Sequence, residues 1–71
     1  MPQAKWEKRL VQCEAVLELL SDLPEQGEDF ALSASETVES IARWIETHED
    51  VTPRQCEALD NIQQGAEAWR Q

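Results

Sequence analysis

Apolar residues recur at helical spacing in three segments of the chain. In the first segment the apolar positions are four, three, four and three residues apart, which places them on one face of a helix. These positions are Trp6, Leu10, Cys13, Leu17 and Leu20. Val16 and Leu23 widen the stripe to the broad apolar face of a bundle helix. Because Pro2 suits the first turn of a helix, the pattern predicts a helix over residues 2–21.

The second apolar stripe is thinner and contains more small residues. It consists of Phe30, Ala34, Thr37 or Val38, Ile41, Ile45 and then His48. Ahead of it, Asp22 is placed to cap a helix, and Glu25, three residues later, to reach back to the amide of the capping residue. Pro24 falls in the first turn, where its missing N–H costs nothing. The pattern predicts a second helix over residues 23–48.

The third segment carries the clearest local signal for a helix start. Thr52 is a good N-cap, Pro53 fits the first helical position, and Gln55 completes a T-x-x-Q capping box. The apolar stripe that follows is Cys56, Leu59, Ile62, Ala66 and Trp69. Gly65 costs about 1 kcal/mol relative to alanine inside a helix, which indicates either close packing against a neighbouring helix or simple tolerance. We expect a third helix over residues 53–70.

Three helices with short connections predict an all-α, up-down-up three-helix bundle that forms a single domain over residues 1–71. Glycine occurs only at positions 27 and 65, and no segment alternates apolar and polar residues over the length of a strand. This topology places Trp6 and Trp44 at the end of the bundle where helices two and three are joined. It places Trp69 at the opposite end, with Leu20, Leu23 and Phe30.

The two cysteines are expected to be free thiols. The first and third helices run parallel in this topology, so the residue level with Cys13 is nearer Asn61 or Ile62 than Cys56. The offset of about six residues corresponds to about 9 Å, whereas the Cα atoms of a disulfide lie within about 7 Å of each other. The sequence therefore argues against an intramolecular disulfide.

Charge is strongly unbalanced, since the chain has 15 acidic and 6 basic residues and a net charge of −9. This charge repels phosphate backbones and anionic membranes and favours basic partners. Residues 24–50 contain eight acids and one base. On the side of helix two opposite its apolar stripe lies an acidic stripe, formed by Glu25, Asp29, Leu32, Glu36, Glu39, Arg43 and Glu46. No apolar run approaches the ~20 residues that span a bilayer, and the first residues do not resemble a signal peptide, so we expect a cytoplasmic protein.

The segment between helices two and three contains the densest group of chemically active side chains. His48, Glu49, Asp50 and Cys56 could in principle ligate a metal or form a nucleophilic site. A zinc site needs three or four converging ligands, and the helical register places Cys13 away from this segment. We interpret residues 49–52 as a structural joint, His48 as a boundary histidine and Cys56 as a core thiol. We predict no metal, no cofactor and no catalytic residue.

Direct nucleic-acid binding by helix three is disfavoured, because a recognition helix needs basic residues that meet phosphates and base edges. The outward residues of this helix sum to −1; they are Arg54, Glu57, Asp60, Gln64, Glu67 and Arg70.

Apolar residues outside the core stripes indicate contacts with another protein. Val11 and Leu19 fall off the stripe of the first helix, and Trp44 lies about 100° from Ile45 around the second, so one of the last two must turn toward the surface. The predicted partner contacts are Val11, Leu19, Leu32, Glu36, Glu39, Trp44 and Glu46. We expect an acidic, non-enzymatic protein that acts through protein–protein contacts, with a homodimer as the simplest partnership. The alternative is an inhibitor that imitates nucleic acid and blocks a basic DNA-handling or defence protein.

The third helix reads T-P-R-Q-C-E-A-L-D-N-I and then G-A-E-A-W, and it follows A-R-W-I-E-T-H-E-D-V. This combination of a capped T-x-x-Q helix after an acidic helix resembles small uncharacterised helical proteins of bacteria and phages, over about half of the chain. The shared residues are capping and core residues, so the resemblance implies no activity and no functional residues.

Overall fold

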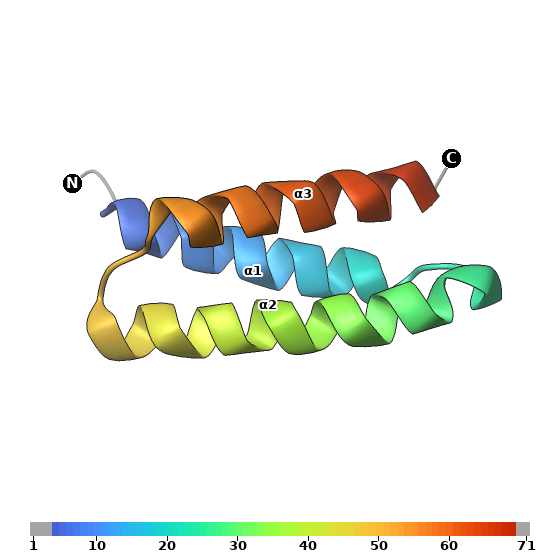
Figure 1. The fold of residues 1–71 in the computed structure, drawn as a ribbon, viewed down its shortest axis with the longest axis horizontal. Coiled ribbons are helices and arrows are strands. Elements are labelled where there is room, and N and C mark those ends of the chain that lie inside the picture. The colour runs from blue at the N-terminus through green and yellow to red at the C-terminus, as the bar shows by residue number, and fades with distance from the viewer. Residues whose placement is uncertain (1–3, 70–71) are drawn as a thin grey trace.

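The computed structural model describes residues 4–69 and confirms the up-down-up three-helix bundle. The helices are α1 (Lys5–Ser21), α2 (Glu28–His48) and α3 (Pro53–Trp69), with a short 3-10 turn η1 (Glu25–Gly27) ahead of α2. α1 contacts both other helices, and α1 and α3 run in the same direction while α2 runs opposite (Figure 1). The bundle is elongated, with extents of 39 × 21 × 17 Å. The predicted helix positions before residue 4 and at residue 70 lie outside the described residues.

The core lies where the three predicted stripes meet. Its fully or almost fully buried members are Cys13, Val16 and Leu20 from α1, Ala34, Val38, Ile41 and Ile45 from α2, and Leu59 and Ala66 from α3. The sequence did not decide whether Thr37 or Val38 faces the core. In the structure Val38 is buried and Thr37 is exposed. None of the helices over residues 4–69 is long and apolar enough to cross a membrane.

The start of α2 differs from the prediction. Asp22 does not cap the second helix; its backbone N–H instead donates to the carbonyl of Leu19 at 3.2 Å, and the N–H of Leu23 donates to the carbonyl of Leu20 at 3.5 Å, which ends α1. Pro24 precedes the 3-10 turn, and the α-helix begins only at Glu28. The reason is steric, because a proline disfavours the helical conformation at the residue before it. Residues 22–27 therefore connect α1 and α2, and this connection is longer than the capping pattern predicted.

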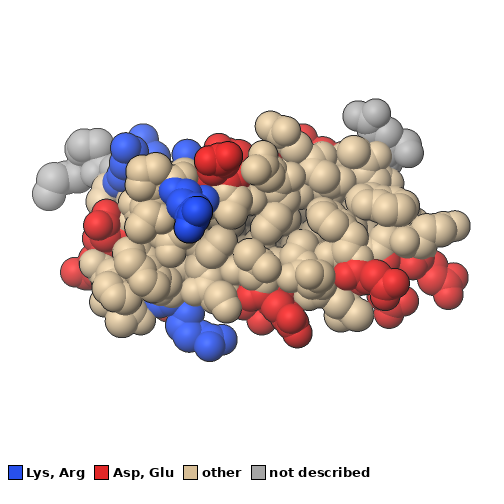
Figure 2. All heavy atoms as spheres, in the orientation of Figure 1, with Lys and Arg blue, Asp and Glu red and all other residues tan. Residues whose placement is uncertain are grey.

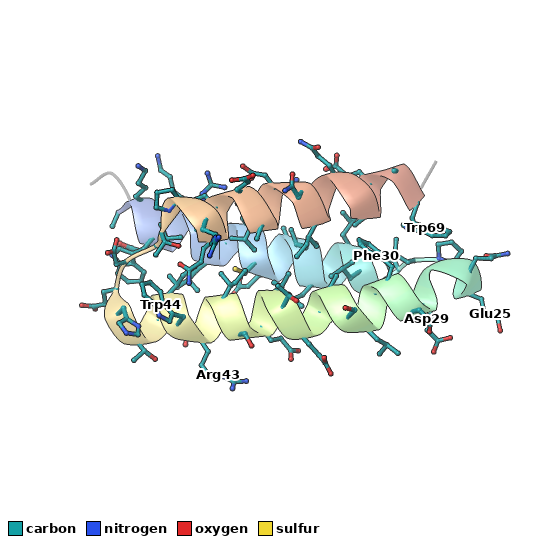
Figure 3. All side chains as sticks on the ribbon, in the orientation of Figure 1. Glu25, Asp29, Phe30, Arg43, Trp44 and Trp69 are labelled. Carbon is teal, nitrogen blue, oxygen red and sulfur yellow. The ribbon has the colours of Figure 1, made fainter. Side chains whose placement is uncertain are left out.

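Both glycines lie against aromatic rings from another part of the bundle. A Cβ on Gly65 would lie 3.0 Å from Cζ of Phe30, so α2 and α3 approach closely here. A Cβ on Gly27 would lie 3.2 Å from the Trp69 ring and 3.5 Å from Cβ of Leu23. The predicted grouping of Trp69 with Leu23 and Phe30 is therefore confirmed, and Trp44 lies at the opposite end (Figure 3).

A candidate protein interface

The joint between α2 and α3 uses its polar groups to shape the backbone. Glu49 adopts a left-handed conformation (φ 51°, ψ 43°) and its N–H donates to the carbonyl of Ile45, which ends α2. The Asp50 carboxylate accepts the N–H of Val51 at 2.8 Å. The Thr52 hydroxyl accepts the N–H of Gln55 at 3.1 Å, and the Gln55 side chain accepts the N–H of Thr52 at 3.0 Å. The predicted capping box is confirmed, and the two acids of the joint act as turn residues.

The prediction that His48 continues the inner face of α2 is wrong, because its side chain is exposed, but it is the last residue of α2, as expected for a boundary histidine. Its ring stacks on the Trp44 ring with centroids 4.1 Å apart, and its Nδ1 lies 2.9 Å from the Trp44 carbonyl oxygen. Trp44 is half-buried and Ile45 fully buried, so Trp44 is the member of this pair that turns toward the surface. Within residues 4–69, no three histidine, cysteine or carboxylate side chains converge as metal ligands would.

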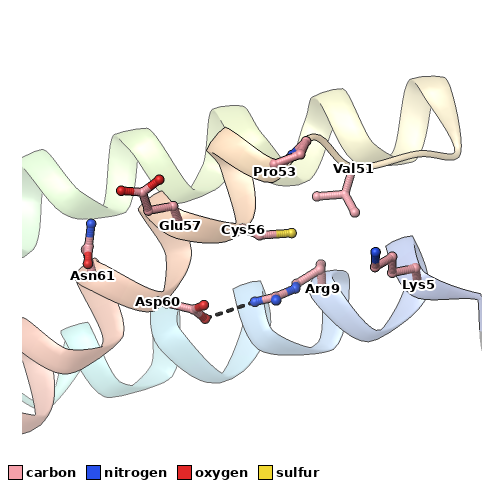
Figure 4. A pocket seen from close by; sticks show the side chains of 8 residues that line it. All are labelled: Lys5, Arg9, Val51, Pro53, Cys56, Glu57, Asp60 and Asn61. Atoms are coloured by element: carbon pink, nitrogen blue, oxygen red, sulfur yellow. Dashed lines mark hydrogen bonds and ion pairs between the residues drawn. The ribbon is translucent and has the colours of Figure 1, made fainter.

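The cysteines are free, as predicted, but their surroundings differ. Cys13 is buried in the core, and burial raises the pKa of its thiol to about 11. Cys56 is only half-buried, which corrects the expectation of a core thiol. Its side chain lines a depression between α1 and α3 together with Lys5 and Arg9 (Figure 4). At the first turn of α3 the side chain of Cys56, the first residue of the apolar stripe, lies toward α1 at the edge of the core.

A polar network fixes the register between α1 and α3. Arg9 Nη1 lies 2.9 Å from a carboxylate oxygen of Asp60 and 2.7 Å from the Gln12 side-chain oxygen. The Gln12 amide donates to Asp60 at 2.9 Å and to Gln63 at 2.8 Å. These hydrogen bonds from Gln12 and Arg9 hold the pKa of Asp60 below its usual value. Since residue 12 lies beside residues 60 and 63, Cys13 is level with residues 61–62, as predicted.

The predicted contact residues lie on several faces of the bundle. Val11 and Leu32 are 55% and 62% exposed. Val11 is nine residues from the core residue Leu20 on α1, and Leu32 is nine residues from the core residue Ile41 on α2. Nine residues correspond to half a turn around the helix axis. Both side chains therefore point away from the core, but on different helices. Leu19 is half-buried, packs against the core and lines a depression with side chains of α3. The acidic side chains Glu36, Glu39 and Glu46 are exposed on α2, with the rest of the acidic stripe except Glu25, which is exposed in η1 and not on the helix as predicted.

A surface that the sequence analysis did not single out lies over α2 and α3. On α2, uncharged residues recur three and four positions apart, and on α3 a matching set faces them. We call this surface the neutral face and define it as Phe30, Ser33, Thr37, Ser40 and Trp44 of α2 with Ala58, Ile62, Gly65, Ala68 and Trp69 of α3. Most of these residues are exposed or half-buried. Figure 2 shows the corresponding surface as a broad, mostly uncharged area, with a basic side chain on its left part and acids along its lower edge, at both ends and at one place on its upper edge.

This face has no acidic residue, although 30% of the residues of the chain are charged, and Arg54 is the base that borders it on α3. The signal available in the sequence was the spacing of Ser33, Thr37 and Ser40, a second uncharged stripe on α2 beside the core stripe. It could not be assigned to a surface without knowing which side of α2 meets α3. The contact between Phe30 and Gly65 shows that this stripe borders α3.

Charge is also separated along the length of the bundle. The described bases Lys5, Lys8, Arg9, Arg43 and Arg54 all lie toward the end that contains the joint, which we call the base-bearing end. The remaining parts of the helices, residues 13–42 and 58–69, contain acids but no base; we call this the acid-only end. In Figure 2 the blue side chains are accordingly confined to one half of the molecule.

No protein-family model, curated protein or solved structure matches this chain.

Proposed function

We propose that this chain is a non-enzymatic protein that acts through protein–protein contacts, and that it self-associates as a homodimer through the neutral face. The observation that carries the proposal is the absence of any Asp or Glu from that face in a chain with a net charge of −9; the base next to it on α3 is Arg54, four residues before Ala58 on the same row. Two copies of such a chain repel each other through most of their surface. The neutral face is where two copies approach with the least repulsion.

The size and chemistry of the neutral face support this proposal. The face follows α2 and α3 along the long dimension of the bundle, which is 39 Å. Small side chains such as Ser33, Ser40 and Ala58 let helices of two copies come close. The half-buried or exposed aromatic side chains of Phe30, Trp44 and Trp69 provide apolar contact area at the ends of the face.

Self-association would also support a small core. A chain of 71 residues is close to the size at which hydrophobic burial alone just offsets conformational entropy. A second copy that binds only the folded chain adds stability in proportion to its concentration.

The test is sedimentation equilibrium between about 5 and 500 μM protein, with two matched substitutions on α2. Thr37→Glu places a carboxylate at the middle of the neutral face, and Leu32→Glu places one on the outer side of the same helix; both positions are exposed. We expect a dimer that Thr37→Glu weakens at least tenfold in Kd and Leu32→Glu leaves within about twofold. A strict monomer at the highest concentration, or a dimer weakened only by Leu32→Glu, would contradict the proposal.

Lack of catalytic activity is part of the same proposal. Among residues 4–69, no hydrogen bond joins His48 to a cysteine, and Nδ1 of His48 is already engaged by a backbone carbonyl. The Cys13 thiol is buried and stays protonated at neutral pH because its pKa is about 11. These observations support a structural role for His48 and Cys13.

The alternative function, imitation of nucleic acid, is favoured by one observation. The acidic stripe of α2 is exposed along its whole length, so its carboxylates are available to a basic partner. This alternative predicts salt-sensitive binding to a basic DNA-handling protein that weakens when Glu36 and Glu39 are replaced by glutamine. Binding that these two substitutions leave unchanged would exclude it.

A further inference from the structure

The separation of charge along the bundle restricts how a second copy can be oriented on the neutral face. A two-fold axis that lies in the interface has two simple directions relative to the helices. If the axis runs along the helices, the two copies are parallel and their base-bearing ends meet. If it runs across the helices, the copies are antiparallel, and the base-bearing end of each meets the acid-only end of the other.

The side chains at the edges of the neutral face distinguish these two arrangements. Arg43 on α2 and Arg54 on α3 lie at the same end of the bundle and on exposed positions of the two helices that form the face. In the parallel arrangement α2 of one copy lies against α3 of the other, so Arg43 approaches Arg54 of the second copy. Like charges at the edge of an interface oppose association.

The antiparallel arrangement brings one pair of opposite charges together on each side of the axis, against a single like-charge approach of Glu36, next to Thr37, to its own copy. Here α2 of one copy lies against α2 of the other, with Thr37 near the two-fold axis. Arg43 and Asp29 are six and eight residues from Thr37 in opposite directions, and both project from the same edge of α2 (Figure 3). The symmetry therefore places Arg43 close to Asp29 of the second copy, twice in each dimer. It also places Trp44 over Phe30 of the second copy.

We propose that the second copy packs antiparallel on the neutral face, with α2 against α2 and Arg43 of each copy beside Asp29 of the other. This inference rests on the proposed homodimer, and it adds the orientation and the residues that select it. The partner recognised by this face is a chain with the same separation of charge, and a uniformly acidic helical surface would not satisfy it.

Charge reversal at Arg43 tests the orientation, because the two arrangements predict opposite signs. In the antiparallel dimer, Arg43→Glu faces Asp29 and weakens association, by roughly tenfold for two exposed pairs at low salt. In a parallel dimer the same substitution faces Arg54 and strengthens association. We expect Arg43→Glu alone and Asp29→Lys alone to weaken the dimer, and the double variant to recover most of the wild-type Kd. The effect should fade in about 0.5 M salt.

Lys8→Glu is the matched control, because it changes the net charge equally at the same end of the bundle but on α1, outside the neutral face. We expect it to change Kd by less than about threefold. An equal loss from Lys8→Glu and Arg43→Glu would show that net charge alone governs association, and would overturn the proposed pairing.

A distance measurement gives a second readout that needs no charge change. Thr47 is exposed and ten residues from Thr37, so a rise of 1.5 Å per residue separates the two copies of residue 47 by about 30 Å in the antiparallel dimer. In a parallel dimer the separation is under about 20 Å. Spin labels on Thr47→Cys, in a Cys56→Ser background, report this distance. A monomeric wild-type protein would overturn both the homodimer and its orientation. A dimer with the short label distance, or a dimer that Arg43→Glu makes tighter, would overturn only the antiparallel orientation.

Discussion

Glu49 is the residue whose replacement should stabilise the protein most simply. It is the only non-glycine residue with positive φ among residues 4–69, and it occupies the position after a helix where glycine is usually found. A left-handed conformation costs a residue with a Cβ about 1–2 kcal/mol. In addition, its carboxylate lies at the negative end of the α2 dipole, which costs about 0.3–1 kcal/mol when exposed.

Glu49→Gly removes both costs but adds the greater conformational freedom of glycine in the unfolded chain, about 0.5–1 kcal/mol. The net expectation is a gain of about 1 kcal/mol in the free energy of unfolding. For a chain of this size that gain raises Tm by about 4–8 °C. Thermal and urea unfolding followed by circular dichroism, at one fixed protein concentration because a dimer would shift Tm, measure the gain.

Two control substitutions separate the contributions. Glu49→Ala removes the charge but keeps the Cβ, so it should gain only a few tenths of a kcal/mol. Glu46→Gly makes the same exchange inside α2, at an exposed helical position, and should lose about 1 kcal/mol. If Glu49→Gly were no more stable than Glu49→Ala, the left-handed conformation would not be the source of the cost, and the reasoning would be refuted.

The remaining predictions concern the close approach of α2 and α3, the cap of α3 and the buried thiol. Gly65→Ala should destabilise by about 1 kcal/mol, since its Cβ would lie 3.0 Å from Phe30 and overpacking outweighs the gain in helix propensity. In a Phe30→Leu background the same substitution should become stabilising, and a double-mutant cycle that shows no coupling would exclude this contact as the cause. Thr52→Ala should cost about 1 kcal/mol in urea unfolding because the first turn of α3 loses its cap, and an unchanged midpoint would show that the hydroxyl contributes nothing. The pKa of Cys13 is raised from 9.0 to about 11 in the folded protein, so unfolding releases a proton at alkaline pH and stability should fall as the pH rises from about 9 to 11. Cys13→Ala should lower stability at neutral pH and remove this part of the alkaline dependence; an identical pH profile for both proteins would contradict the assignment.

Local interactions made the helices and the joint predictable. The T-x-x-Q box at Thr52 and Gln55 needs only residues that are neighbours in sequence, and it forms as predicted. The core stripes also followed from periodicity, because burial of one face of each helix is the main source of stability in a bundle. The start of α2 was missed because the capping pattern at Asp22 competed with the restriction that Pro24 places on Leu23, and the steric restriction was stronger.

Stripe ends were less predictable than stripe centres. His48 and Cys56 both lie at helix termini, where fewer neighbouring residues cover a side chain than at the middle of the bundle. His48 stacks on Trp44 at the surface, and Cys56 turns toward Lys5 and Arg9. Hydrophobic periodicity therefore predicted the environment of His48 and Cys56 poorly, although these were the side chains that looked most reactive in the sequence.

The sequence by itself determined the number of helices, their approximate ends, their antiparallel order and the excess of acidic charge, because each depends on spacing, capping and composition. Only the tertiary structure decided which side of the α2 stripe borders α3. Hydrophobic periodicity states which face of a helix is buried, but a three-helix bundle can place its third helix on either side of the first two, and packing such as that of Phe30 on Gly65 selects one. That choice brings Ser33, Thr37 and Ser40 beside α3, and it creates the neutral face on which the proposed function depends.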